Sequence, residues 1–336
     1  MNNKELTKLN SFKKASLPVL ECCIITDYQI RAVKNNGSHW IAYYINHDFQ
    51  VNRPGLVYIE QFVKIAKNYT IDRIEFSENK AEIFTDAGVF AVDDMPAIED
   101  FPTVLGHFGY KDVAQIDMKA LQTIASYTSD DVSRPAMMGV YFDKENIAAT
   151  NGHIMKWIEY QGTEEPFIIP ADAIALLSGK EPVIIRYSVE KETVLLSCNG
   201  EMVETETIKD PYPDYKSVIP KIEENDPYVV LPVKETVKYL KAAKISASDA
   251  ARQISLMVNG SVSIQSEDID LGQSYQSPAI QTDTRGAITI GFNADYLEKV
   301  LKDSGKESVR LDMQTPNRAS IVDGSGLIMP VMIMAK

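Results

Sequence analysis

The chain has 336 residues, of which 45% are hydrophobic and 24% are charged, and its formal net charge is −13 at pH 7. This length suits two or three domains that each bury a core, and the composition is ordinary for a globular protein. The acidic balance argues against a protein that coats nucleic acid through its overall charge, although a segregated basic surface would still allow contact with DNA.

Neither the termini nor the cysteines indicate export or membrane insertion. No stretch approaches the roughly 18 uninterrupted apolar residues that a membrane helix needs, so we expect no membrane partner. The N-terminal residues lack the apolar segment of a secretory signal. The three cysteines, Cys22, Cys23 and Cys198, show no CxxC spacing, which predicts free thiols that pack in the core in a reducing compartment. We therefore expect a cytoplasmic protein.

In chain order, the first predicted elements form two helix-plus-strand halves. A helix is expected over residues 3–15, and strands are expected over 21–45. A second amphipathic helix follows, and its three strands end at Pro96. Two such halves make an α+β domain with antiparallel sheets.

The same order of elements recurs twice more. The helix that opens the second copy has Asp117 as a suitable N-cap, and the helix that opens the third has Pro232 at a suitable first position. The second halves of these copies end at Pro211 and Pro330, so the closing prolines lie about one domain length apart. This period predicts three tandem copies of one domain rather than a solenoid.

Short polar stretches mark the predicted boundaries between these copies. They lie near His107–Lys111 and near Glu223–Asp226. The predicted domains are therefore 1–108, 109–224 and 225–336.

Two Asn-Gly pairs predict tight turns between strands. In the stretch Arg134–Met155, an apolar run ends at Phe142, and a polar turn leads to a second strand. Gly152 then follows Asn151 before another apolar run, and Asn259-Gly260 lies between two alternating segments in the third copy. Glycine adopts a positive φ without steric cost, so both sites are suited to hairpin turns.

Lysines recur at helical spacing on the predicted helices. Lys234, Lys238 and Lys241 are spaced i, i+4 and i+7, so they lie along one helix face. A lysine stripe on a single helix is usually only a solvated face. Its recurrence on most helices of an acidic protein favours a basic surface that contacts phosphates without reading base sequence. Further pairs have i, i+3 or i, i+4 spacing: Lys4 and Lys8, Lys64 and Lys67, Lys299 and Lys302.

The sequence gives little support for an enzyme. The two SGK triplets, Ser178–Lys180 and Ser304–Lys306, lack the upstream glycine of a phosphate-binding loop and are typical of helix C-terminal turns. There is no HExxH motif, and the four histidines are dispersed. We therefore expect a non-catalytic protein without a metal or cofactor.

Several motifs occur in an order and at a spacing that resemble one known family, the bacterial DNA sliding clamp, the β subunit of DNA polymerase III. The resemblance covers nearly the whole chain. In the first domain LPVL (Leu17–Leu20) and EDFPTV (Glu99–Val104) are similar to family motifs. The most specific motifs are TNGHIM (Thr150–Met155), YPDYKSVIP (Tyr212–Pro220), IGFNADYL (Ile290–Leu297) and IMPVMI (Ile328–Ile333).

The resemblance implies three tandem clamp domains in a ring-forming α+β fold. Two subunits would associate head to tail into a homodimer that encircles double-stranded DNA, with the sheets outside and the helices lining the hole. Such a protein would be a processivity factor, a non-catalytic accessory subunit of a DNA polymerase. The lysines implied to face DNA are Lys4, Lys8, Lys64, Lys67, Lys119, Lys234, Lys238 and Lys241.

The resemblance also implies a hydrophobic groove between the second and third domains. In the family this groove docks short linear motifs of the polymerase, the clamp loader and repair proteins. Methionines suit such a site because their flexible side chains adapt to several peptides. Carried over by motif, the groove residues are Arg134, Met137, Thr150, Gly152, His153, Ile154, Met155, Pro213, Val218, Tyr296, Met329, Pro330, Val331 and Met332.

Two groove positions depart from the family pattern. Ile154 stands where the family usually has a basic residue, and Met332 stands where it has another. These departures favour a peptide preference of this chain's own. They also leave a second interpretation, a clamp-fold interaction scaffold or a mobile-element or phage paralogue that the main replisome does not load.

Overall fold

A computed structural model describes residues 3–13, 17–78, 80–93, 96–102, 109–248, 252–268 and 270–333. The chain forms two compact units. The first unit comprises Met1–Ala125, Gly139–Glu145 and Tyr160–Asp210, and the second comprises Ser126–Met138, Asn146–Glu159 and Pro211–Lys336. The predicted boundary at residue 108 lies outside the described residues, so the division into three domains stays a prediction.

An eight-stranded antiparallel sheet runs through the first unit, in the order β5-β1-β2-β3-β16-β15-β14-β9. Buried side chains such as Ile30, Ile41 and Val203 form its core. Its strands are β1 (Cys22–Ile25), β2 (Gln29–Asn35), β3 (Trp40–Asn46), β5 (Gly55–Tyr58), β9 (Lys111–Ile116), β14 (Val183–Ser188), β15 (Thr193–Cys198) and β16 (Glu201–Glu206).

The remaining strands of the first unit form a four-stranded sheet and an antiparallel pair. The sheet has the order β4-β6-β7-β8, and β10 pairs with β13. Their bounds are β4 (Gln50–Val51), β6 (Ile71–Phe76), β7 (Lys80–Thr85), β8 (Gly88–Asp93), β10 (Gly139–Phe142) and β13 (Phe167–Pro170).

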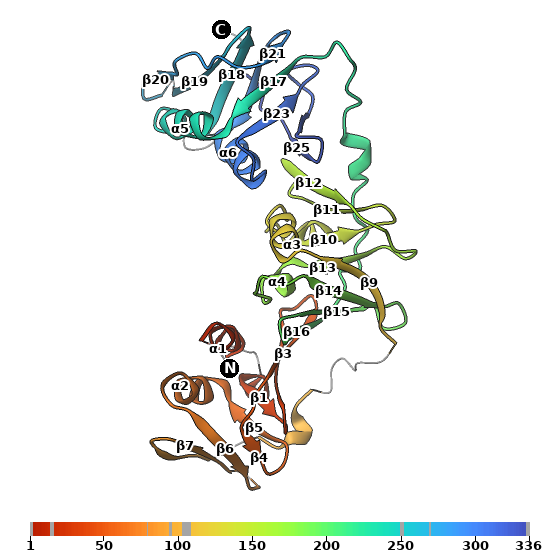
Figure 1. The fold of residues 1–336 in the computed structure, drawn as a ribbon, viewed down its shortest axis with the longest axis vertical. Helices are drawn as coiled ribbons and strands as arrows, with labels where there is room; N and C mark the ends of the chain where they lie inside the picture. Colours follow the sequence, from red (N-terminus) through yellow and green to blue (C-terminus); the bar gives the residue numbers. More distant parts are fainter. Residues whose placement is uncertain are drawn as a thin grey trace. The chain divides into compact units, whose positions relative to one another are not determined.

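The helices of the first unit bury one face each. In α2 (Ile59–Asn68), Ile59, Phe62 and Val63 are buried, while Lys64 and Lys67 are exposed. Helix α1 packs beside α2 (Figure 1). The other helical segments are α1 (Asn3–Leu9), α3 (Met118–Ala125), α4 (Ala171–Ile174) and the 3-10 turns η1 (Asn10–Phe12), η2 (Pro18–Glu21) and η3 (Ile98–Asp100).

The second unit contains two runs of antiparallel strands, in the orders β11-β12-β25-β24-β23-β17-β21 and β20-β19-β18-β22. The strands are β11 (Asn146–Thr150), β12 (Ile154–Glu159), β17 (Tyr228–Pro232), β18 (Gln253–Asn259), β19 (Val262–Asp268), β20 (Gln273–Gln276), β21 (Thr284–Arg285), β22 (Ala287–Asn293), β23 (Ser308–Asp312), β24 (Ser320–Val322) and β25 (Gly326–Ile328).

Two helices lie side by side in the second unit, α5 (Val233–Ala243) and α6 (Ala294–Asp303) (Figure 1). Helix α5 buries Val237 and Leu240, whereas α6 buries Leu297 and Leu301. The unit also contains the 3-10 turns η4 (Pro135–Met138) and η5 (Tyr215–Val218).

One kind of strand pairing joins consecutive predicted copies. In the first unit β3, the third strand of the first copy, pairs with β16, the last strand of the second copy, through contacts such as Tyr43 opposite Val203. In the second unit β12 pairs in the same way with β25, the last strand of the third copy, with Ile154 opposite Ile328. The joints are therefore continuous sheet, which supports the predicted internal repeat.

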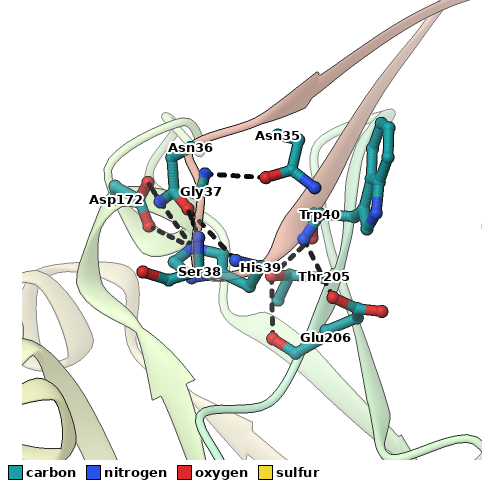
Figure 2. A network of polar contacts seen from close by, with 9 residues as sticks. All are labelled: Asn35, Asn36, Gly37, Ser38, His39, Trp40, Asp172, Thr205 and Glu206. Atoms are coloured by element: carbon teal, nitrogen blue, oxygen red, sulfur yellow. Dashed lines mark hydrogen bonds and ion pairs between the residues drawn. The ribbon is translucent and has the colours of Figure 1, made fainter.

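Polar contacts fix the end of the β3–β16 joint (Figure 2). The His39 ring nitrogen Nε2 lies 3.1 Å from Oδ1 of Asp172, and the Asn36 amide donates to the other oxygen of this carboxylate at 3.1 Å. The Trp40 backbone N–H donates to Glu206 at 3.1 Å. The tip of the β2–β3 hairpin is thereby bound to both α4 and β16.

Most predicted elements are confirmed, with three local differences. Asp117 accepts a hydrogen bond from the Ala120 N–H at 2.9 Å, as expected for an N-cap. Pro232 lies one position earlier than predicted, as the residue before α5. The helix expected after Pro170 spans only Ala171–Ile174, and the one expected over 3–15 becomes a 3-10 turn at Asn10, with 14–15 outside the described residues.

The structure also bears on the predictions made for the cysteines and for membrane-spanning helices. Cys22, Cys23 and Cys198 are free and buried, as expected. In the described part of the chain, no helix combines the length and the apolar character that a bilayer span requires.

Candidate functional site

The predicted groove residues centre on the turn between β11 and β12. The Asn151 side-chain oxygen accepts hydrogen bonds from the His153 and Ile154 N–H groups at 2.9 and 3.0 Å. The Thr150 hydroxyl donates to the Ile154 carbonyl and accepts from the Gly152 N–H. Gly152 has a φ of +89°, a conformation that favours glycine. The Asn-Gly pair therefore forms the predicted turn and leaves Gly152 and His153 exposed.

A second loop lies against this turn. A Cβ added at Gly152 would come within 3.1 Å of the Arg134 guanidinium and 3.6 Å of the terminal methyl of Met137. Arg134 donates through Nε to Asp131 at 2.8 Å. The Ser133 hydroxyl, the Ser133 N–H and Arg134 together lower the pKa of Asp131 to about 2, so the carboxylate stays ionised and holds the guanidinium. Asp131 was not predicted from the sequence, because only its contact with Arg134 shows that it belongs to this site.

Helix α6 brings an aromatic ring to the same place. The Asn293 side chain caps this helix by accepting from the N–H groups of Asp295 and Tyr296. This cap sets the first turn, where the Tyr296 ring stacks on the His153 ring with 5.3 Å between centroids. The motifs TNGHIM and IGFNADYL, which are far apart in sequence, therefore meet at one site.

The C-terminal tail lies beside the same turn. Met329 follows β25, and its N–H donates to the His153 carbonyl at 2.8 Å. Val331 then donates to the Gly291 carbonyl at 2.8 Å. Met329 and Met332 are 36% and 73% exposed. The tail thus presents two methionines to solvent beside the β11–β12 turn.

The other predicted groove residues differ in their accessibility. Thr150, Ile154 and Met155 are buried, so their side chains support the strand pair rather than offering surface. Ile154, the residue that departs from the family pattern, lies opposite Ile328 in the sheet. Its buried side chain offers no surface to a partner, whereas the basic residues Arg134 and His153 of the predicted groove are exposed.

Two predicted residues lie on a different segment, around the 3-10 turn η5. Pro213 and Val218 are both exposed, and Tyr215 between them is buried. The Pro213 carbonyl accepts from the Tyr215 N–H at 2.7 Å, which fixes the local bend. Their assignment to the groove continues to rest on the family resemblance.

The predicted lysine stripes are exposed on most helices. Lys234, Lys238 and Lys241 lie opposite the buried face of α5. Within the described ranges, none of these three has an acidic side chain at ion-pair distance. Lys4, Lys64, Lys67 and Lys119 are exposed on α1, α2 and α3. Exposure makes these side chains available to phosphates, and their role remains a proposal.

Lys8 differs from the other predicted DNA-facing lysines. Its ammonium donates to Glu201 at 2.5 Å and to the Ser178 hydroxyl at 2.8 Å, and its side chain is 14% exposed. Glu201 is itself buried and also accepts from the Tyr43 hydroxyl. The Lys8 charge is therefore neutralised inside the unit, so Lys8 is a poor candidate for a phosphate contact.

The lysines of α6 are also engaged by acids. Lys299 pairs with Asp303 at 2.9 Å, and Lys302 pairs with Glu298. Glu298 also binds Lys244, which follows α5. The uncompensated positive charge of this helix pair thus lies on α5.

No metal site emerges from the described residues. They contain no group of three or more His, Cys, Asp or Glu side chains that could hold a metal ion. The triplet Ser304–Lys306 forms the turn after α6, as predicted, with Gly305 at φ +67°.

Part of the chain is similar in sequence to a known family. Residues 216–326 match the family described as DNA polymerase III beta subunit, C-terminal domain. Over 125 residues the chain is 32% identical to the Beta sliding clamp of Borreliella burgdorferi. This match covers 34% of the chain and 32% of the relative, so it spans about a third of that curated protein.

Solved structures extend the likeness to nearly the whole chain. A DNA polymerase sliding clamp from Pseudomonas aeruginosa is 21% identical, with a TM-score of 0.80 over 98% of this chain and 97% of that one. The DNA polymerase III subunit beta from Borrelia burgdorferi is 18% identical, with a TM-score of 0.81 over 99% and 98%.

The whole chain therefore has the fold of the bacterial sliding clamps, an α+β fold of antiparallel sheets and helices. Within it, residues 216–326 match the model of the C-terminal domain of the DNA polymerase III beta subunit. The resemblance to the sliding clamps that the sequence motifs indicated is confirmed for the fold.

Proposed function

We propose that this chain is a DNA polymerase processivity factor, a sliding clamp that encircles double-stranded DNA as a head-to-tail homodimer. It would perform no chemical step and would act in the cytoplasm on replicating DNA. It would hold the polymerase, the clamp loader and repair proteins through short linear motifs. The observation that carries the proposal is the repeated strand pairing between consecutive copies of the predicted domain.

The pairing between copies leaves two of its strands, β8 and β20, without a partner in the described residues. β3 pairs with β16, and β12 pairs with β25, so the third strand after the first helix of each copy pairs with the last strand of the next copy. By the same rule β20, the third strand after the first helix of the third copy, would pair with the last strand of another chain's first copy, which is β8. In the residues described, β8 and β20 each end their sheet. Free edges of this kind are ready templates for pairing.

Pairing of β20 with β8 of a second chain is heterologous, because it joins different surfaces of the two subunits. Such contacts close into a ring when the rotation permits. Exposed apolar side chains accompany both edges, since Val89 on β8 is 55% exposed and Leu271 before β20 is 69% exposed. Burial of these side chains would add to the backbone hydrogen bonds of the new strand pair.

Duplex DNA would be held by topology rather than by tight contacts. The exposed lysines of α1, α2, α3 and α5 would contact phosphates without base specificity. The acidic net charge of the chain does not conflict with this role, because the proposed DNA-facing charge is confined to the helices.

The proposed head-to-tail dimer is tested by the substitution Leu271→Asp. A carboxylate at this edge would have to be desolvated in the interface, so we expect the variant to sediment as a monomer of 37.5 kDa where the native chain sediments as a dimer. Val189→Asp, at a similarly exposed apolar position in the β14–β15 turn, is the matched control and should remain dimeric. A native chain that sediments as a monomer at micromolar concentration would refute the proposal.

A further inference from the structure

The C-terminal tail crosses strand β22 at a glycine. Val331 forms a bridge with Gly291, and its N–H donates to the Gly291 carbonyl at 2.8 Å. The Gln253 amide of the neighbouring strand β18 donates to the Met332 carbonyl at 3.1 Å. Together with the bond from Met329 to His153, three hydrogen bonds fix the tail between residues 329 and 332.

Gly291 leaves no room for a side chain under this tail. A Cβ built there would lie 2.3 Å from the Val331 carbonyl oxygen and 2.9 Å from Cγ1 of Ile333. The nearest obstacle is backbone, which cannot rotate away as the end of a flexible side chain can. Any residue other than glycine would therefore displace the tail from β22 or distort the strand.

We propose that Gly291 is a positioning residue of the peptide groove. By lacking a side chain it lets the tail lie on β22, and the tail then holds Met329 and Met332 in place for an apolar partner peptide. The residue touches no peptide itself. This inference rests on the proposed function of the groove, because Gly291 is proposed to order the tail, which forms one wall of that groove.

The test uses Gly291→Ala in the full chain, with two readouts. Amide hydrogen exchange of residues 329–333 reports the tail directly, and we expect it to become faster in the variant. Binding of a fluorescein-labelled peptide from the clamp-binding segment of the host's replicative polymerase reports the groove. We expect binding to weaken about tenfold, because the two methionines must then be ordered during binding.

A double-mutant cycle separates positioning from a general effect on the sheet. The second change is a chain that ends at Pro330, which removes the contact with Gly291. If Gly291 acts through the tail, the truncated chain and the truncated chain with Gly291→Ala will bind the peptide equally. Additive losses would show that the alanine acts on the β18–β22 pair instead, and would overturn the inference.

Two further variants keep the result interpretable. Gln253→Ala removes one tail bond without touching Gly291, so it should also speed exchange of the tail even if Gly291→Ala fails to fold. Met329→Asp should abolish peptide binding without changing the mass of the dimer. If the native chain fails to bind the peptide while Gly291→Ala still speeds tail exchange, the proposed groove fails and the anchoring of the tail stands. Unchanged tail exchange in both Gly291→Ala and Gln253→Ala would refute the inference.

Discussion

Arg134 owes its position to a carboxylate three residues earlier in the chain. Asp131 accepts from the Ser133 hydroxyl at 2.7 Å, from the Ser133 N–H at 3.0 Å and from Arg134 at 2.8 Å. All three donors favour the charged form, which explains the low pKa of the carboxyl. The loop therefore presents Arg134 to the Gly152 turn in one orientation over the physiological pH range.

This arrangement predicts an acid transition of the loop. The pKa of Asp131 is about 2 in the folded chain, below its usual value of 3.8. Because folding lowers this pKa, the contribution of Asp131 is present above about pH 4 and is lost as the pH falls toward 2. NMR titration of the Asp131 side-chain carbon should find a midpoint near 2, and Ser133→Ala should raise it. A midpoint at the usual value in the native chain would contradict the account.

Roles that depend on neighbouring residues were predictable from the sequence, whereas roles that depend on contacts between distant residues were not. Asn151-Gly152 and Asn259-Gly260 were predictable as turns, because their chemistry acts within four residues. The ion pair with Glu201 that removes Lys8 from the DNA-facing candidates was not predictable from spacing, since 193 positions separate the two residues. Gly291 could have been suspected from the glycine in IGFN, but only the tail crossing it gives the reason.

At the scale of elements, two buried glutamates on β16 bind the joint with β3. Glu201 accepts from Tyr43 at 2.6 Å, and Glu204 accepts from Tyr44 at 2.7 Å. The two glutamates are three positions apart on one strand, so they point to opposite faces of the sheet. Each face of the β3–β16 joint is therefore held by a carboxylate–tyrosine contact.

Removal of Glu204 should weaken this joint strongly. Glu204 also accepts from the Tyr110 hydroxyl at 2.6 Å, so Glu204→Ala leaves two hydroxyl donors without this acceptor. At roughly 1–3 kcal/mol for each unsatisfied buried group, we expect the free energy of unfolding to fall by about 3 kcal/mol. Urea unfolding followed by Trp40 fluorescence, in a Trp157→Phe background, measures the loss. Glu204→Gln retains an acceptor and should lose less; equal stability of the alanine variant would contradict the role.

Helix α5 is predicted to carry most of the DNA affinity of the second unit. Charge reversal of Lys234, Lys238 and Lys241 should weaken binding to duplex DNA, most strongly at low salt. The slope of log K against log salt should become shallower by about 2 to 3, because each lysine that no longer binds a phosphate reduces it by about one. Fluorescence anisotropy with a labelled duplex at several salt concentrations provides both quantities.

The control for this experiment changes the net charge equally elsewhere. Lys111, Lys144 and Lys221 are exposed and lie outside the helices. Their reversal should leave the salt slope nearly unchanged. Equal effects of the two triple variants would show that net charge, rather than the surface of α5, governs binding.

The sequence was a better guide to long elements than to short ones. The lysine spacing on α5 correctly predicted a face opposite Val237 and Leu240. The triplet Ser178–Lys180 was predicted to form the C-terminal turn of a helix, yet α4 ends earlier, at Ile174. On α6 the lysines at positions 299 and 302 pair with acids of their own helix. Their spacing resembles that of the lysines on α5, so spacing alone could not show which lysines are engaged in ion pairs.

For the whole molecule, the repeat of one domain explains both the internal joints and the proposed ring. Each joint uses the same two strands of the repeat, and the free edges β8 and β20 are the members of that pair still without partners in the described chain. The motifs were sufficient to predict the fold over nearly the whole chain. They could not identify the edges that associate, because unpaired strands are visible only once the sheet order is known.

The most direct measurement of the central claim is retention on DNA of defined topology. The chain is loaded onto a nicked circular plasmid by the host's clamp loader with ATP, and the plasmid is then cut once. A ring that encircles DNA stays on the circle and slides off after linearisation, and this is the result we predict. Equal retention on circular and linear DNA, or no retention by a chain that still binds the polymerase peptide, would contradict the account, and the second result would favour an interaction scaffold.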